Sequence, residues 1–390
     1  MALLLENASC VMPHRVARDR TIVVADGRIE RIATDQHDIA AGPSDTVVDL
    51  EGSYLVPGLI DLHVHGAMGG DFLDEELPLD KMVRYFHRHG VTGVLATLIP
   101  EPVEKSVRVM RRLVRQFREG GYTDTLWGFH SEGPFLNPEM GGGAAPENFV
   151  RPCLSAWEDL SEAGDGMLKM ISVAPELEGI GPVIRAAHRA GTVVSAGHTT
   201  ASYAQTLQAI EDGLSSTTHL FNAMERLRHR DPGVLLASLM RPEIIAQLNA
   251  EGGHVHPLVM SMAYQLKGPA GLVLTSDIRS TAGLGESGEG STDALDVREG
   301  TIVGSKAALD SSVRVMVREV DVTLPDAVQM ASLNPAMLLG VNDRKGSIAA
   351  GKDADLAVMD EDLEVTMLIQ GGEIVYESET AGCHRRAGQA

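Results

Sequence analysis

The sequence is poor in cysteine, in aromatic residues and in long apolar runs. Its three cysteines, Cys10, Cys153 and Cys383, lie far apart and form no CxxC pair. Such sparse thiols argue against a disulfide scaffold and favour a reducing compartment. No apolar run approaches the roughly 20 residues of a membrane-spanning helix, and the chain opens without a signal-peptide pattern. We therefore expect a cytoplasmic protein that does not enter a membrane.

Positive charge is also scarce. The chain has 33 Lys and Arg against 54 Asp and Glu, which gives a formal net charge of −21. Nucleic-acid binding depends on clustered Lys and Arg, so this charge argues against a nucleic-acid partner. The overall field would also repel an anionic substrate, and such a substrate would need cations placed locally in its binding site.

The two ends of the chain are rich in short apolar runs, which are typical of strands. These runs lie at 2–6, 20–25, 28–32 and 47–50, and again at 355–359, 365–369 and 374–376. We expect residues 1–56 and 346–390 to build one small β-sandwich domain together. The last ten residues, from about 381, are predicted to form a polar tail.

The middle of the chain, 57–345, alternates strand-like runs with amphipathic stretches. Strands are expected at 58–65, 91–98, 125–132, 168–174, 192–198, 214–220, 244–249 and 271–277, and helices include 103–118, 181–190, 203–211 and 257–266. Eight strand–helix units of this length predict an α/β fold, a (β/α)8 barrel. A doubly wound sheet is the alternative, because periodicity does not fix closure.

Titratable side chains lie at the carboxyl ends of five of the expected strands. They are His63 and His65, Glu132, His198, His219 and Asp277. Barrel enzymes carry their chemistry at the carboxyl ends of the strands, so these side chains are expected to meet there. The i, i+2 spacing of the first two histidines places both imidazoles on one face of a strand. The polar residues favour the barrel over the doubly wound sheet.

The residue types indicate a metal site. Glu132, His198 and His219 provide one carboxylate and two imidazoles, the ligand set of an open catalytic site. Asp277 suits a general base, with roles as a further ligand or a helix cap as alternatives. His63 and His65 could hold a second metal, with Glu132 bridging. We expect one or two divalent ions, zinc first, with iron, nickel or cobalt also compatible with these ligands.

Four segments together resemble a known family. PGLIDLHVHG at 57–66 looks like the amidohydrolase superfamily, and HSEGPFL at 130–136, SAGHT at 195–199 and THLFNAM at 218–224 are similar to the N-acetylglucosamine-6-phosphate deacetylases. The resemblance implies removal of acetyl from an N-acetylated amino-sugar phosphate. It implies Glu132, His198 and His219 as metal ligands and Asp277 as the acid/base.

The resemblance also implies a substrate site and a homodimer. Arg230 corresponds to a phosphate-binding arginine that can reach the neighbouring subunit, and His254 would contact substrate and support catalysis. The other substrate-contacting positions implied by the match are Asn222, Ala223, Ile302, Val303 and Gly304.

The chain departs from the family pattern around the substrate. Ala144 and Ala145 stand before Pro146, where the family usually has a sugar-contacting histidine just before the proline, and Arg279 follows the expected base by two residues. The segment 304–310 replaces a Ser/Thr-rich version. The metal ligands are kept, so the sequence favours retained chemistry and leaves the identity of the substrate open. The alternatives are an amidohydrolase acting on another amide, such as an N-acyl amino acid or a cyclic amide, and a non-catalytic scaffold.

Overall fold

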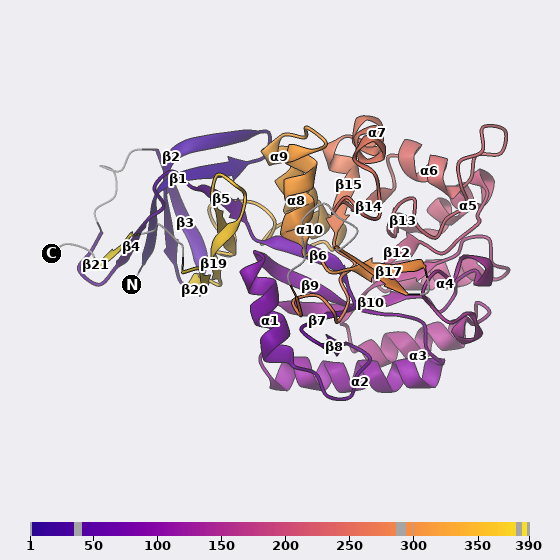
Figure 1. Ribbon diagram of the computed structural model, residues 1–390. Coiled ribbons are helices and arrows are strands. Elements are labelled where there is room, and N and C mark those ends of the chain that lie inside the picture. Colours follow the sequence, from indigo (N-terminus) through magenta and orange to yellow (C-terminus); the bar gives the residue numbers. More distant parts are fainter. Residues whose placement is uncertain (1, 35–40, 286–293, 299, 380–383, 388–390) are drawn as a thin grey trace.

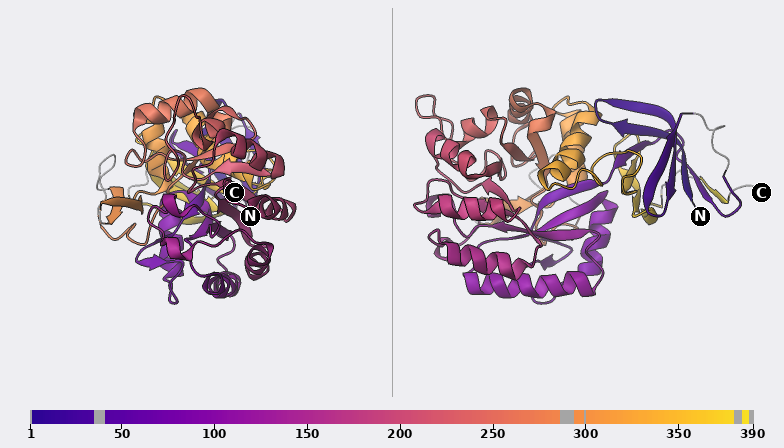
Figure 2. Two further views of the ribbon diagram at one scale, coloured as in Figure 1. Left: turned by 90° about the vertical axis from the view of Figure 1, so that its right-hand side faces the viewer. Right: turned by 180° about the vertical axis from the view of Figure 1, so that it is seen from behind.

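The computed structural model describes residues 2–34, 41–285, 294–298, 300–379 and 384–387. Two large sheets dominate it (Figure 1). One is a barrel of parallel strands wrapped by helices. The other is built from strands near both ends of the chain and lies to one side of the barrel, with both termini beside it (Figure 2).

The barrel confirms the predicted (β/α)8 fold. Its eight parallel strands follow one another in chain order around the sheet. They are β6 (Leu59–Val64), β9 (Val91–Leu98), β10 (Leu126–Glu132), β11 (Leu168–Val173), β12 (Val193–Ala196), β13 (Leu214–Thr217), β14 (Ile245–Asn249) and β15 (Leu272–Thr275). All eight residues of β9 are buried, as expected for strands covered on both faces.

The seam between the last and first strands is closed at the carboxyl ends. Val64 and Ile278 form a parallel bridge, and the backbone N–H of Asp277 donates to the carbonyl of His63 at 2.9 Å. This closure brings His63, on the first strand of the barrel, next to Asp277, which follows the last strand.

Helices cover the outside of the barrel (Figure 2). They are α1 (Leu79–Arg88), α2 (Val103–Glu119), α3 (Leu154–Gly164), α4 (Ile180–Arg189), α5 (Tyr203–Asp212), α6 (Val234–Met240), α7 (Pro257–Lys267), α8 (Leu309–Arg318), α9 (Leu324–Val328) and α10 (Asn334–Leu338). Their apolar stripes face the strands, as in α2, where Val109, Leu113 and Phe117 are buried. None of the described helices combines the length and the apolar character needed to cross a membrane.

The second sheet joins the two ends of the chain. Its strands are β1 (Leu3–Met12), β2 (Arg15–Ala25), β3 (Arg28–Ala33), β4 (Thr46–Asp49), β5 (Tyr54–Pro57), β18 (Leu356–Met359), β19 (Val365–Gln370), β20 (Glu373–Glu377) and β21 (His384–Ala387). Antiparallel pairing of β5 with β18 connects the amino-terminal strands to the carboxyl-terminal ones. The division of the chain at residues 56 and 345 into separate domains stays a prediction.

The expected polar tail is wrong over residues 384–387. These residues form β21, which pairs antiparallel with β4. The polar composition of this stretch concealed a strand that gains its backbone hydrogen bonds from a distant partner. Two small hairpins complete the described strands, β7 (Gly66–Ala67) with β8 (Gly70–Asp71), and β16 (Leu295–Arg298) with β17 (Thr301–Ser305).

Candidate metal centre and active-site cavity

The strand ends deliver the predicted side chains to the mouth of the barrel. Glu132 is the last residue of β10, whereas His198, His219 and Asp277 each lie two residues beyond a strand. These three have left-handed backbones, with φ of 49°, 33° and 54°. Such conformations cost roughly 1–2 kcal/mol for residues other than glycine and cluster at functional sites. They turn the side chains inward from the strand direction.

Glu132, His198 and His219 form one compact group. The Nε2 atoms of both histidines lie 3.0 and 3.1 Å from Oε1 of Glu132 and 3.1 Å from each other. The Nδ1 atoms face the backbone carbonyls of Met140 at 2.7 Å and Asn222 at 3.2 Å. A carbonyl only accepts, so each Nδ1 carries a proton, and in the neutral ring Nε2 presents a lone pair.

Three electron-pair donors, a carboxylate oxygen and two imidazole nitrogens, therefore face one another. When the imidazoles are neutral, no hydrogen atom lies between these donors to form a hydrogen bond. A divalent cation satisfies such a set, and backbone carbonyls holding Nδ1–H are the usual support of metal-binding histidines. The donor set and its orientation thus fit a divalent metal ion.

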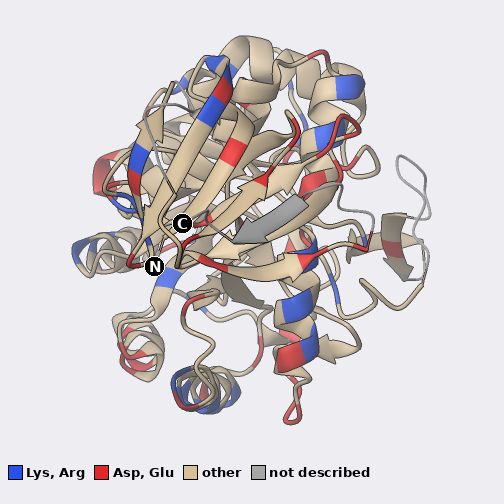
Figure 3. Ribbon diagram, turned by 90° about the vertical axis from the view of Figure 1, so that its left-hand side faces the viewer, with Lys and Arg blue, Asp and Glu red and all other residues tan. Residues whose placement is uncertain are grey.

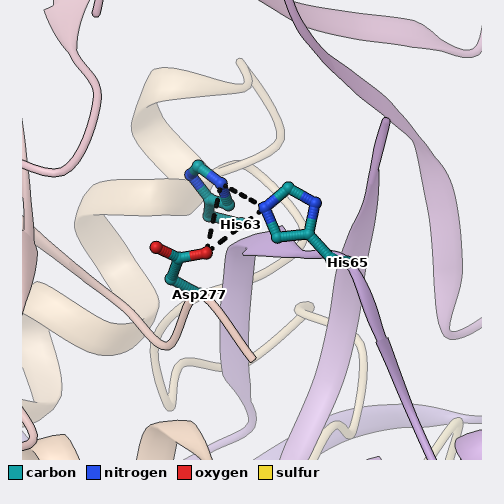
Figure 4. Close-up of side chains that lie close together, drawn as sticks. All are labelled: His63, His65 and Asp277. Carbon is teal, nitrogen blue, oxygen red and sulfur yellow. Dashed lines mark hydrogen bonds and ion pairs between the residues drawn. The ribbon is translucent and has the colours of Figure 1, made fainter. Parts of the chain in front are cut away.

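His63, His65 and Asp277 form a second group, which Figure 4 shows. The two histidine Nε2 atoms are 3.0 Å apart and lie 3.6 and 3.2 Å from Oδ1 of Asp277. Glu132 stands between the groups, with Oε1 3.6 Å from His63 and Oε2 3.6 Å from His65. A carboxylate in this position is placed to serve both groups.

The electrostatics keep both carboxylates ionised. Burial would raise the pKa of Glu132, but the surrounding imidazoles, where they carry protons and no metal ion stands between them and the carboxylate, outweigh burial and hold that pKa well below its usual range. The same balance lowers the pKa of Asp277, where His63, His65 and His254 oppose burial. Burial lowers the pKa of His254, but Glu251 and Asp277 outweigh it and the net shift is upward.

Several supporting residues escaped the sequence reasoning. Asn249 donates from Nδ2 to Oδ2 of Asp277 at 3.1 Å, and Glu251 lies 2.7 Å from Nδ1 of His254. Asp61 accepts from the backbone N–H groups of His63 and Ser276, both at 3.2 Å, across the barrel seam. Asn249 and Glu251 follow the same pattern as the predicted residues, because both are polar and lie at or just beyond the carboxyl end of β14.

A cavity of about 200 Å³ opens over the two groups. Of the residues predicted to contact substrate, it is lined by Ala144, Asn222, Ala223, His254, Ile302 and Val303. Ala145, Gly304 and Arg230 are not in this lining, and Arg230 is exposed. His63 is fully buried beneath the cavity.

Arg279 is the one lysine or arginine among the described residues that line the cavity. Its Nε donates to the carbonyl of Val303 at 2.6 Å, which fixes the guanidinium at the wall. It passes over Gly304, where a Cβ atom would lie 2.6 Å from Cγ of Arg279 and 2.7 Å from the carbonyl oxygen of Asp277. Glycine at 304 therefore makes this arrangement sterically feasible.

Comparisons with known proteins agree with the fold and identify the family. The model of the amidohydrolase family matches residues 54–375. The N-acetylglucosamine-6-phosphate deacetylase of Bacillus subtilis is 32% identical over 97% of this chain and 98% of its own length. The N-acetylgalactosamine-6-phosphate deacetylase of Escherichia coli O157:H7 is also 32% identical, over 84% of this chain and 89% of its own length.

A solved structure is similarly close. A mutant N-acetyl-D-glucosamine-6-phosphate deacetylase from Mycobacterium smegmatis, in complex with N-acetyl-D-glucosamine-6-phosphate, superposes with a TM-score of 0.87 at 30% identity. The match covers 96% of this chain and 99% of that one. The chain therefore belongs to the amidohydrolase family, in the branch of the N-acetylglucosamine-6-phosphate deacetylases.

Proposed function

We propose that this protein hydrolyses N-acetylglucosamine-6-phosphate to glucosamine-6-phosphate and acetate. The observation that carries the proposal is the single cavity in which a metal-type donor set, Asp277 and an arginine converge. The names of the relatives supply the substrate class. The Bacillus subtilis and Escherichia coli relatives, named for the glucosamine and the galactosamine substrate, are both 32% identical to this chain. The galactosamine epimer is therefore the second candidate substrate.

Glu132, His198 and His219 would hold one divalent ion, and His63 and His65 would hold a second if it binds. We propose zinc, with iron, nickel or cobalt as other occupants compatible with these ligands. A divalent ion supplies a Lewis acid that polarises a carbonyl and acidifies water.

The protein's own residues would move the proton. Oδ1 of Asp277 accepts the proton of the attacking water as the new carbon–oxygen bond forms, while Asn249 holds Oδ2 in place. Asp277 then gives that proton to the amide nitrogen as the carbon–nitrogen bond breaks. His254, held by Glu251, would donate from Nε2 to the oxygen on which negative charge develops.

Substrate recognition would use the remaining lining. Asn222, Ala223, Ala144, Ile302 and Val303 border the cavity and can contact the sugar, in part through backbone groups. Nε of Arg279 is engaged by Val303, and the other N–H groups of its guanidinium can bind an anionic group of the substrate. The forked donors of a guanidinium match phosphate oxygens.

Arg230 would serve a neighbouring site. It is exposed and outside the cavity of its own chain. We propose a homodimer in which Arg230 reaches the partner's substrate phosphate, and a cytoplasmic location for this dimer.

The decisive assay compares four amides. Purified protein with measured metal content is given the 6-phosphates of N-acetylglucosamine and N-acetylgalactosamine, free N-acetylglucosamine, and an N-acetyl amino acid. We expect the highest kcat/KM for a sugar phosphate. Equal kcat/KM with and without phosphate would refute the substrate assignment, and preference for the N-acetyl amino acid would favour another amidohydrolase activity.

A further inference from the structure

A second and larger cavity, of about 690 Å³, lies on the outside of the barrel between α1 and α8. It shares no lining residue with the candidate active site. Its volume is within the range of about 300–1,000 Å³ that small-molecule sites occupy. None of the residues assigned to the proposed reaction lines this cavity.

The walls of this cavity are basic. Lys81, Arg84 and Arg88 recur at i, i+3 and i+7 and so share one face of α1, and Lys306 lies across from them. Bands of blue are stacked along this helix in Figure 3, where α1 faces the viewer. Within the described part of the chain, none of the four forms an ion pair with a carboxylate. In a chain of net charge −21, four cations without such partners around one cavity are unusual.

The carboxylate in this lining does not offset them. Asp310 is buried at the first turn of α8 and lies 3.0 Å from His89 Nδ1 and 3.0 Å from a terminal nitrogen of Arg314. It is the one acidic residue among the described residues of the lining, and its charge is already engaged. The described residues of the lining therefore carry a net positive charge.

Apolar and hydrogen-bonding groups accompany the charges. The ring of Tyr85 and the side chain of Met68 line the cavity, and the Tyr85 hydroxyl donates to the carbonyl of Lys306 at 3.4 Å. The amino terminus of α8 also opens here, and Ala308 provides no side-chain cap to its N–H groups. The site thus offers both hydrogen-bond donors for an anion and an apolar surface for an uncharged organic group.

We propose that this cavity binds a phosphate ester of a small metabolite. The two arginines and two lysines would hold the phosphate, since arginine forks match phosphate oxygens and lysine adds point charge. The space beyond a bare phosphate would take the esterified sugar or nucleoside against Tyr85 and Met68. A sugar phosphate and a nucleotide share this chemistry.

Calorimetric titration of the full-length protein tests the proposal. The probes are inorganic phosphate, glucose 6-phosphate and ADP at near-physiological salt. The variant Arg84→Ala/Arg88→Ala removes two cavity cations. The control Arg108→Ala/Arg115→Ala removes the same charge from exposed positions on α2. Melting temperature and deacetylase kinetics are recorded for each protein.

We expect glucose 6-phosphate or ADP to bind a class of sites that weakens at least about tenfold in the cavity variant and is unchanged in the control. Deacetylase kcat and KM should be unchanged in both, and the better of the two esters identifies the source. Identical binding in all three proteins, or equal weakening in both variants, overturns the proposal. Esters that bind no better than inorganic phosphate also overturn it.

Discussion

Asp277 is the residue whose role is most directly measurable. Replacing it by Asn keeps the shape and the left-handed backbone, which Asn tolerates, but removes the proton acceptor. We expect kcat to fall by about 10³-fold, within the range for general acid–base groups, with KM little changed.

The matched control is Asp19→Asn. Asp19 is exposed and has a φ of 53°, close to the 54° of Asp277. Steady-state kinetics and melting temperature are measured for both variants. A variant at 277 that retains wild-type kcat would remove Asp277 from the mechanism.

Arg279 should determine how strongly phosphate contributes to substrate binding. Loss of a charged hydrogen bond costs about 1.5–3 kcal/mol, so Arg279→Ala should raise KM for the sugar phosphate by roughly 10- to 100-fold. The unphosphorylated sugar should be unaffected. Arg279→Lys keeps the charge but lacks the forked donors, so its KM for the sugar phosphate should lie between those of the wild type and Arg279→Ala. Equal loss on both sugars would instead indicate that Arg279 only supports the cavity wall.

At the scale of elements, Asp310 links α8 to the end of α1 and makes the free energy of unfolding depend on pH. Burial would raise its pKa, but His89 and Arg314 outweigh burial and lower it below the ordinary value. A carboxyl with a lowered folded-state pKa stabilises above its unfolded pKa, near 3.9, and loses that contribution as pH falls further.

Urea unfolding of wild type and Asp310→Asn over a series of pH values measures this contribution. We expect the difference in free energy of unfolding to shrink as pH falls below about 4, where the carboxyl takes up its proton. A difference that grows as pH falls below about 4 would contradict the assignment.

The elements differ in how well sequence predicts them. The run at 91–98 coincides with β9, because a strand buried on both faces is apolar throughout. The runs at 192–198 and 271–277 continue past β12 and β15, because the chain leaves the sheet in left-handed turns at His198 and Asp277. Residues 384–387 were missed, because their strand depends on β4, more than 330 residues earlier in the chain.

The candidate site shows the same division. Strand ends and residue types predicted that Glu132, His198 and His219 would meet at the mouth of the barrel, since parallel strands bring their carboxyl ends together. His63 and His65 were expected to share Glu132, whereas Asp277, expected as the general base, also lies in their group. Sequence did not reveal that Asn249 and Glu251 orient Asp277 and His254, because those contacts depend on side-chain packing. Arg230 lies outside the cavity of its own chain, and its expected reach into a neighbouring subunit stays a prediction.

For the whole molecule, metal removal should change stability as well as activity. A ligand that binds only the folded state stabilises it by mass action. Dialysis against a chelator should abolish activity and lower the melting temperature, and zinc should restore both. In His198→Ala the chelator should shift the melting temperature much less. An unchanged melting temperature in the wild type would argue against a metal held by the folded protein.

The proposed dimer allows a complementation test. Arg230→Ala and Asp277→Asn are each expected to be weakly active. If Arg230 serves the neighbouring site, a refolded equal mixture contains dimers with one complete site, and activity should approach about a quarter of wild type. No gain on mixing would place Arg230 in its own site or outside the mechanism. Sedimentation velocity establishes the dimer independently.

Gly304 has a consequence for how this enzyme can diverge. A side chain there would press on the carbonyl of Asp277, so the placement of Asp277 itself requires glycine at this position. The space that Arg279 occupies is therefore preserved whether or not an arginine uses it. Substitutions at position 279 are therefore expected to change the wall of the cavity while the backbone that carries Asp277 stays in place.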